Sequence, residues 1–213
     1  MSGCCETPAG SLPRARMWEQ YTPKQKAGKL CYYLCSTKSD TPVRNAPEKK
    51  EPNYETKTYN SCASCNQRSV QAAINNRVSH IFFVTRYTGT LKKYRGRCFI
   101  VGFYEIGQTR RIGKRSSIKA SQIYFVSIEK AYEVNRKTWR RINRNGMTKD
   151  LVNLRHATQR IDGNLFEKIL SCLTAGKDIS NKYSREVARL KRIAIPGLCC
   201  NEDAKRGRRN DQR

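Results

Sequence analysis

The alternation of hydrophobic and polar positions is strongest in residues 80–134. Runs rich in Ile, Val, Phe and Tyr are separated there by Gly, Lys and Arg, in the order HIFFVTRYTGT, LKKYRGRCFIVGFYEIG, QTRRIGKRSSIKA and SQIYFVSIEKAYEV. β-Branched and aromatic residues between turn-forming residues are typical of strands. The pattern predicts three strong strands and a fourth beside them, in a small antiparallel sheet or barrel.

The faces of the first two strands follow from this alternation. Successive side chains of a strand point to opposite faces, so the first strand should place Ile81 and Phe83 on one face and Phe82 on the other. Residues 98–106 are apolar on both faces apart from one glutamate, which predicts a strand covered on both sides or forming a barrel wall. Gly102, in the middle of that strand, indicates a sharp bend or the close approach of another backbone or ligand.

Helical spacing flanks the strands. Residues 66–78 predict a short helix whose inward positions are Val70, Ala73, Ile74 and Val78. Beyond residue 134 the period changes from two to about 3.6. A helix capped by Thr148 should turn inward Leu151, Leu154, Thr158 and Ile161. A helix capped by Asp162 should end at Gly176 and turn inward Leu165, Phe166, Ile169, Leu170 and Leu173. A third should begin near Ser180, with Tyr183, Val187, Leu190 and Ile193 on one face.

These elements predict an α+β protein in four parts. Residues 1–65 form a cysteine-rich N-terminal region that contains a flexible loop, 36–60, rich in Thr, Lys, Glu, Pro and Asn. Residues 66–146 form the β-barrel and residues 147–198 a helical cluster. Residues 199–213 form a basic tail that we expect to be disordered.

The charge of the chain indicates a polyanionic partner. The net charge is +26, from 43 basic and 17 acidic residues, so self-repulsion is strong without counter-charge. Nucleic acid is the commonest such partner, because neutralised phosphates release counterions. An anionic membrane surface would also supply the charge, but no apolar run approaches the roughly 20 residues that span a bilayer. No signal-like segment opens the sequence, so we expect an intracellular protein, cytoplasmic or nucleoid-associated.

Basic and aromatic residues are interleaved between the strands. Cations hold phosphates and aromatic rings stack on bases, so this mixture is typical of nucleic-acid binding; a solvated surface is the alternative for a single run of charge. In a barrel, the two basic loops would converge on one rim. The candidate contacts are Arg86, Tyr87, Lys92, Lys93, Tyr94, Arg95, Arg97, Arg110, Arg111, Lys114, Arg115, Trp139 and Arg140.

The ten cysteines indicate a metal site rather than disulfides in an intracellular protein. Two thiolates two residues apart can reach one tetrahedral ion, and two more ligands complete a zinc site. The candidate zinc ligands are Cys31, Cys35, Cys62 and Cys65. The pairs at 4–5 and 199–200 compete for this role, and thiolates from both ends of the chain could hold an iron–sulfur cluster instead. The remaining two, Cys98 and Cys172, lie in apolar patterns and are expected to be buried free thiols.

Catalytic patterns are scarce. The sequence has no G-x-S-x-G, H-E-x-x-H or P-loop motif, and its two histidines are His80 and His156. Three glutamates, Glu105, Glu129 and Glu133, lie on or near the predicted strands. They could hold a divalent ion for phosphodiester cleavage or neutralise neighbouring arginines.

The succession HIFFVTRYTG, RGRCFIVGFYEIG and IYFVSIEKAYEV, within residues 78–135, resembles the strands of PUA-like barrels. It is most similar to the EVE, ASCH and YTH branch and the nucleotide-modification-associated proteins grouped with it. The resemblance implies binding of RNA or DNA, in some members with a flipped and often modified base held between aromatic walls. The residues that resemble those walls are Phe83, Tyr87, Phe103, Tyr104 and Trp139. The cysteine pairs and C-terminal helices lie outside that pattern.

Together these patterns predict a nucleic-acid-binding protein with a PUA-like barrel, basic loops and a structural metal. One alternative is a metal-dependent nuclease or base-processing enzyme built on the same sheet. A second is a structural component of a ribonucleoprotein particle. The sequence leaves open RNA against DNA, the base recognised, zinc against an iron–sulfur cluster, and the oligomeric state.

Overall fold

The computed structural model describes residues 17–32, 56–60, 64–112, 115–142, 160–182 and 185. Within them the strands are β1 (Glu19–Gln20), β2 (Gln25–Tyr32), β3 (Thr58–Asn60), β4 (Val78–Arg86), β5 (Cys98–Ile112), β6 (Arg115–Phe125), β7 (Tyr132–Glu133) and β8 (Arg160–Asp162). The α-helices are α1 (Ser64–Asn75), α2 (Arg136–Ile142) and α3 (Gly163–Thr174), and two short 3-10 turns are η2 (Lys92–Tyr94) and η3 (Ile128–Lys130).

The strands form one sheet in the order β3-β6-β5-β4-β2-β8, with β1 and β7 also paired to β5. The three central strands β4, β5 and β6 are antiparallel, as the alternation predicts. The pairing of β2 with β4 is parallel, and β8 adds to β2 as an antiparallel edge. The mixture of helix and strand that the sequence predicts is confirmed.

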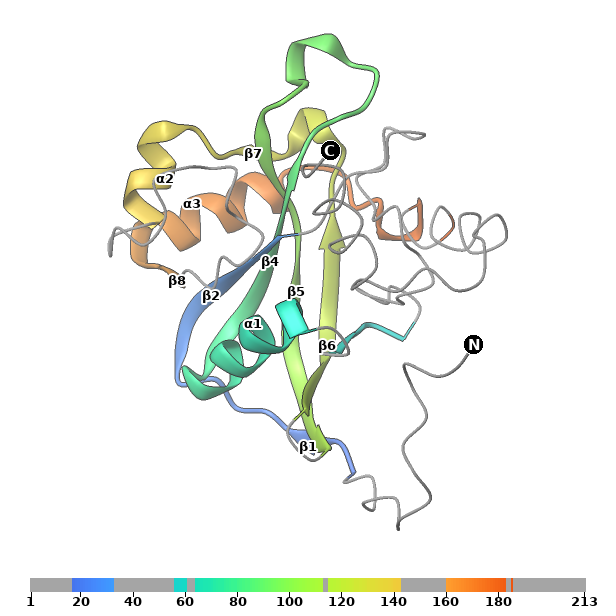
Figure 1. The fold of residues 1–213 in the computed structure, drawn as a ribbon, viewed down its shortest axis with the longest axis vertical. Coiled ribbons are helices and arrows are strands. Elements are labelled where there is room, and N and C mark those ends of the chain that lie inside the picture. Colours follow the sequence, from blue (N-terminus) through green and yellow to red (C-terminus); the bar gives the residue numbers. More distant parts are fainter. Residues whose placement is uncertain are drawn as a thin grey trace, which may run out of the picture.

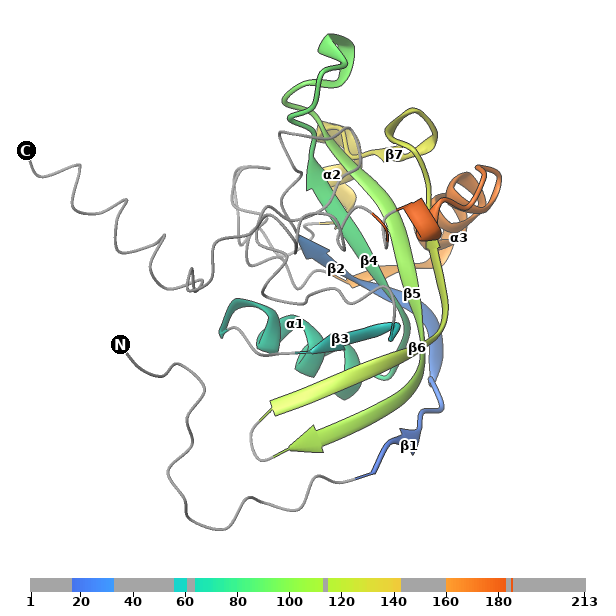
Figure 2. The ribbon, with the colours of Figure 1, turned by 90° about the vertical axis from the view of Figure 1, so that its right-hand side faces the viewer.

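The sheet is curved but open among the described strands (Figure 2). A closed barrel needs its two edge strands to pair with each other, and here the edges β3 and β8 lie at opposite ends of the strand order. The curvature instead accompanies register shifts, one between β4 and β5 and two between β5 and β6. The structure therefore shows a curved sheet where the sequence pattern predicts a barrel.

Helices cover both faces of the sheet (Figure 2). On one face, α1 buries Val70 and Ala73 against residues that include Ile81 and Phe83 of β4. On the other face, α2 and α3 pack against a second cluster that includes Phe82. The assignment of alternate β4 residues to opposite faces is thus confirmed, and so is the expectation that β5 is covered on both sides.

Gly102 lies where two aromatic side chains need room. It pairs with Phe83 on β4 and with Phe125 on β6, and those two rings pack 5.5 Å apart. A Cβ at Gly102 would come closer than 3.0 Å to the backbone oxygen of Tyr124 and to the ring of Phe125. Beside it, the register of β4 and β5 shifts by one residue, so that Val84 pairs with Ile100. Both expectations for this glycine, a distortion of the strand and a close approach, are confirmed.

The predicted helices are found in part. The first, α1, begins at Ser64 and ends at Asn75, so Val78 belongs to β4 and not to the inward face of the helix. The helix after Asp162 is α3, which buries Leu165, Phe166, Ile169 and Leu173. It ends at Thr174, shortly before Gly176, as expected. The helix expected after Thr148 and most of the helix expected after Ser180 lie outside the described residues.

Ile161 is in a strand, although the sequence pattern places it in a helix. It lies in β8, whose three residues pair with Ala27, Gly28 and Lys29 of β2. Asp162 stands at the N-cap position of α3 as expected, but its side chain makes no capping hydrogen bond. Its carboxylate instead lies 3.0 Å from Nε of Arg160.

The sheet extends beyond the expected boundaries of 66–146. Strand β2 comes from the expected N-terminal region and β8 from the expected helical cluster, and both join β4 in one sheet. Strand β3 comes from the end of the expected loop 36–60 and pairs with β6. One continuous sheet therefore connects three of the four expected parts.

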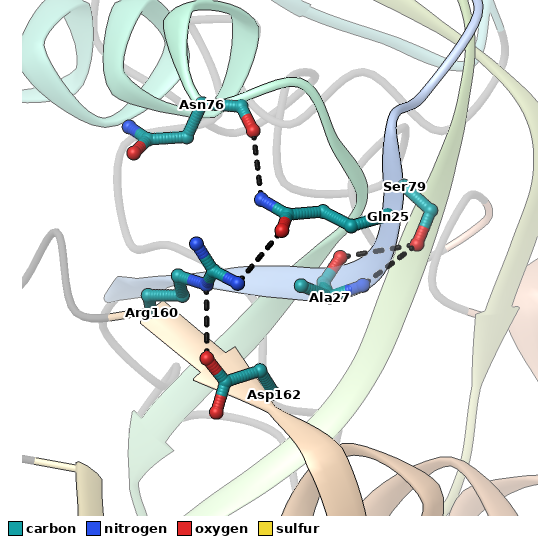
Figure 3. A network of polar contacts seen from close by, with 6 residues as sticks. All are labelled: Gln25, Ala27, Asn76, Ser79, Arg160 and Asp162. Carbon is teal, nitrogen blue, oxygen red and sulfur yellow. Dashed lines mark hydrogen bonds and ion pairs between the residues drawn. The ribbon is translucent and has the colours of Figure 1, made fainter.

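A polar network ties the edge of this sheet to α1 (Figure 3). The side chain of Gln25 donates to the carbonyl oxygen of Asn76 at 2.9 Å and accepts from Nη2 of Arg160 at 2.8 Å. On the neighbouring strand, Ser79 Oγ accepts from the N–H of Ala27 at 3.2 Å and donates to its carbonyl oxygen at 3.1 Å. These contacts hold the N-terminal strand against β4, β8 and the end of α1.

Candidate nucleic-acid interface

The connection between β4 and β5 is a basic projection from one end of the sheet (Figure 1, green, top). We call residues 86–97 the basic hairpin. It contains five basic residues and no acidic residue. Its cations are Arg86, Lys92, Lys93, Arg95 and Arg97, all of which have exposed side chains.

Two tyrosines and a glycine shape the basic hairpin. The backbones of Tyr87 and its partners continue the ladder, with Tyr87 N donating to Arg97 O and Gly96 N to Tyr87 O, each at 2.9 Å. Gly96 has a φ of +81°, in the left-handed region that glycine adopts most readily. Tyr87 is fully buried beneath the loop, and its hydroxyl accepts from the N–H of Leu91 at 3.3 Å. Tyr87 therefore anchors the hairpin and does not present a ring for base stacking.

Tyr94 is the half-buried aromatic residue of the hairpin. Its ring packs edge-on against Tyr87 and Phe99, with centroids 6.2 and 5.6 Å apart. The Nζ atom of Lys93 lies 4.7 Å from the centre of the Tyr94 ring. A hydrogen bond to Tyr94 raises the pKa of Lys93, so this lysine is cationic at neutral pH. Tyr94 and Lys93 together offer a partly exposed ring beside a cation.

Helix α2 adds a second basic surface beside the hairpin. Its exposed residues are Arg136, Lys137, Arg140 and Arg141, and its buried residues are Thr138, Trp139 and Ile142. Strand β7, just before α2, pairs with the start of β5, where Glu133 is opposite Phe99. This pairing places the start of α2 at the base of the hairpin.

The burial of Trp139 corrects its expected role as a stacking platform. Its side chain is 6 % exposed and belongs to the core cluster on the α3 face of the sheet. Conversely, the sequence analysis did not select Arg136, Lys137 and Arg141. Their signal was available, because basic residues at 136, 137, 140 and 141 lie on one face of a helix whose opposite positions are Trp139 and Ile142.

A cavity of about 240 Å³ lies between the base of the hairpin and the start of α2. We call it the arginine pocket. It is lined by Arg86, Gly96, Arg97, Cys98, Glu133, Val134, Asn135 and Arg136. Three guanidinium groups and one carboxylate give these residues a net charge of +2.

The polar groups around the arginine pocket are held by defined contacts. Nε of Arg86 donates to the carbonyl oxygen of Gly96 at 3.1 Å. Nη1 of Arg97 lies 3.5 Å from Oε2 of Glu133, a long contact between side chains that are 55 % and 42 % exposed. Exposed pairs of this kind contribute little to stability and are exchanged easily. The side-chain oxygen of Asn135 accepts from the N–H of Thr138 at 2.9 Å.

Cys98 provides an apolar wall of the arginine pocket. Its thiol is free and buried, as the sequence pattern predicts. Burial raises the pKa of Cys98, and the nearby Arg86 only partly opposes that effect. The thiol is therefore protonated at neutral pH and adds no negative charge to the site. The other expected buried thiol, Cys172, is half-buried, and its pKa is also raised by burial.

The second basic group lies at the opposite end of β5. Arg110 and Arg111 are part of β5 and Arg115 begins β6, so these residues form the end of a two-stranded ribbon rather than a loop. Lys114 lies outside the described residues. The fifteen residues of β5, at about 3.3 Å per residue, separate this group from the basic hairpin. The two groups therefore do not converge on one rim.

An aromatic contact holds the arginine at that far end. The guanidinium carbon of Arg110 lies 4.7 Å from the centre of the Trp18 ring. Its Nε atom is buried and has no hydrogen-bond partner among the described residues. Part of the charge of this second group is thus already engaged with the protein itself.

The five aromatic residues that resemble the walls of a base pocket are all in the core. Phe83, Tyr87 and Tyr104 are fully buried, and Phe103 and Trp139 are 2 % and 6 % exposed. They also lie on both faces of the sheet, because Phe83 and Phe103 belong to different core clusters. In this structure they do not enclose a common pocket.

The expected metal site falls mainly outside what the structure describes. Cys35 and Cys62 lie outside the described residues, and only the backbones of Cys31, in β2, and Cys65, in α1, are described. Among the described residues, no group of three or more His, Cys, Asp or Glu side chains is placed to hold a metal ion. This part of the chain also contains no helix long and apolar enough to span a membrane.

Comparison with known proteins adds no assignment to this geometry. No family model, curated protein or solved structure matches the chain.

Proposed function

We propose that the protein binds nucleic acid through the basic hairpin, helix α2 and the arginine pocket between them. The observation that carries the proposal is the meeting of these surfaces. Nine basic residues, five in the hairpin and four in α2, lie at one end of the sheet. The described acidic residues beside them are Glu129 and Glu133, and Glu133 is paired with Arg97.

The partner is contacted mainly through its phosphates. Basic side chains provide phosphate contacts, which position a protein without reading the sequence. Most of the candidate aromatic residues are buried, and Tyr94 is the exception in this surface. Stacking on bases therefore has a small part, and base preference should be weak. The resemblance to PUA-like barrels supports the same class of partner, because those barrels bind RNA or DNA.

Phosphate-led binding also bears on the choice among the three functions considered. Recognition of a flipped base needs an exposed aromatic cage, and the residues that resemble one are in the core. Binding without base reading fits a structural component of a nucleoprotein particle. We therefore place this protein among backbone-binding proteins, acting on RNA or DNA.

The proposal is tested by removing three exposed cations from the surface. We expect the combined substitution Lys92→Gln, Arg140→Gln and Arg141→Gln to lower the slope of log K against log salt by about 3, roughly one for each lost phosphate contact. The control removes the same charge elsewhere, with Lys24→Gln, Lys26→Gln and Lys57→Gln, all exposed in the wild type. Fluorescence anisotropy with single-stranded RNA and DNA of mixed sequence measures both variants.

Two results would contradict the proposal. One is the absence of binding to either nucleic acid at low salt. The other is an equal change of slope in the two triple variants, since that would show a response to net charge and not to this surface. Oligonucleotides of different base composition should differ only a few-fold in affinity for the wild type.

A further inference from the structure

We infer that the arginine pocket holds the terminal phosphate of a nucleic-acid strand. This inference rests on the proposed function and adds a ligand to it: a phosphomonoester at a strand end, as distinct from the phosphodiesters along the backbone. Three properties of the pocket lead to it, namely its volume, its charge and its hydrogen-bond donors.

The volume of the pocket excludes a nucleotide. Pockets for small organic molecules measure about 300–1,000 Å³, whereas this cavity measures about 240 Å³. A base and its sugar do not fit together with a phosphate in that space, but a phosphate group does. A phosphate within a strand is attached to a nucleoside on both sides, while a terminal phosphate is attached on one side only. A small cavity with one mouth accepts the terminal group more readily.

The charge of the pocket matches a phosphomonoester. Its lining residues carry three guanidinium charges and one carboxylate charge, for a net +2. A phosphomonoester carries about −1.5 to −2 at pH 7, and a phosphodiester in a strand carries a single negative charge. The protonated thiol of Cys98 leaves this balance unchanged. The pocket therefore neutralises a terminal phosphate almost completely, and has excess charge for an internal one.

The donors of the pocket are oriented before any ligand arrives. A guanidinium group has five N–H donors. Arg86 uses Nε to bind Gly96 O, and Arg97 uses Nη1 toward Glu133. The guanidinium group of Arg136 has no hydrogen bond or ion pair with the rest of the described chain. Arginine forks bind phosphate oxygens in pairs, so the three side chains can satisfy several oxygens at once.

Asn135 adds a neutral donor to these cations. Its Oδ1 atom accepts from the backbone N–H of Thr138, which assigns the oxygen end of the amide. The NH₂ group of Asn135 is then left for another acceptor. Charged and neutral donors that are already held in place bind an anion at a lower entropic cost than flexible surface lysines do.

The experiment compares oligonucleotides that differ only at their ends. One sequence is prepared with a 5′-phosphate, a 3′-phosphate or hydroxyl groups at both ends, each with an internal fluorophore. We expect the wild type to bind a phosphorylated strand about tenfold more tightly than the hydroxyl strand. Arg136→Gln should remove this difference, and Arg136 is chosen because it is exposed and its guanidinium is not engaged within the described chain.

Arg140→Gln is the matched control on the same helix. Arg140 is exposed and does not line the arginine pocket. Its substitution should weaken binding of the phosphorylated and hydroxyl strands by the same factor. Inorganic phosphate provides a further arm: at millimolar concentration it should reduce the affinity for the phosphorylated strand toward that for the hydroxyl strand.

Each outcome separates this inference from the proposed function. Equal affinity for all three strands, with binding retained, overturns the inference and leaves nucleic-acid binding intact. Loss of binding to every strand overturns both. If inorganic phosphate binds in an Arg136-dependent way and the strands still bind alike, the pocket takes the free ion and the assignment to a strand end is wrong.

Discussion

Gly102→Ala is expected to destabilise the protein by at least about 3 kcal/mol, the upper part of the range for an overpacked core. The added Cβ would overlap the backbone oxygen of Tyr124 and the ring of Phe125. A flexible side chain can move aside, but a backbone carbonyl in a strand pairing cannot do so without breaking the sheet. The ring of Phe83 on the neighbouring strand also packs against Phe125. Urea denaturation, with the free energy of unfolding extrapolated to water, measures the effect.

Gly163→Ala is the control for this substitution. Gly163 has a φ of +54° and no heavy atom within 4 Å of an added Cβ. Alanine there meets only the backbone cost of the left-handed region, about 1–2 kcal/mol. A loss at Gly102 no larger than the loss at Gly163 would show that the contact across the sheet is not a steric limit.

Acidification is expected to cost the fold about 3 kcal/mol between about pH 6.5 and about pH 4, through His80 alone. Its ring lies among Phe82, Phe103 and Phe166, with centroids 6.0, 5.2 and 5.1 Å away. Desolvation by burial lowers the pKa of His80 from 6.5 to about 4, and Glu105 opposes this only partly. The unfolded chain takes up a proton near pH 6.5 while the folded chain does not. Stability is therefore complete above that pH and is lost as the pH falls toward 4.

The difference between wild type and His80→Leu isolates this contribution. Carboxylates also titrate near pH 4, but they do so in both proteins. Unfolding by urea at a series of pH values should show a steeper loss in the wild type than in the variant within this window. Parallel curves for the two proteins would mean that His80 is not the group responsible.

The central strands could be predicted because their pattern does not depend on distant partners. Ile81, Phe82 and Phe83 alternate between two apolar faces, and any sheet covered on both sides accommodates that pattern. The stripe of α3 is equally local, since Phe166, Ile169 and Leu173 recur at helical spacing. Local hydrophobic periodicity is enough for such elements.

The edge of the sheet could not be predicted in the same way. Strand β2 contains Gly28, a residue that weakens isolated strands, yet here the missing side chain makes room for the ring of Phe82. Its partner β8 has three residues and forms only because β2 is beside it. The parallel pairing of β2 with β4 joins residues about fifty positions apart along the chain. These contacts arise from tertiary packing, which local sequence does not specify.

The candidate site shows the same division. The exposed cations of the hairpin are recognisable from sequence, because Lys and Arg rarely lie in a core. The neighbourhood of Arg86, Arg97 and Arg136 depends on the pairing of β7 with the start of β5. The roles of Tyr87 and Trp139 depend on burial, since an aromatic residue between cations suits a core and a binding surface equally. Only the helical spacing of Trp139 and Ile142 gave a signal for its burial.

The central claim, that nucleic acid binds at the hairpin and α2 end of the sheet, is tested most directly by lysine footprinting of the wild-type protein. Exposed lysines are acetylated with and without a saturating oligonucleotide, and mass spectrometry gives the change at each position. Binding at this end should protect Lys92, Lys93 and Lys137 and leave Lys24, Lys26 and Lys57 as reactive as before; all six are exposed in the free protein. Protection of the second group without the first, or of neither, would contradict the account.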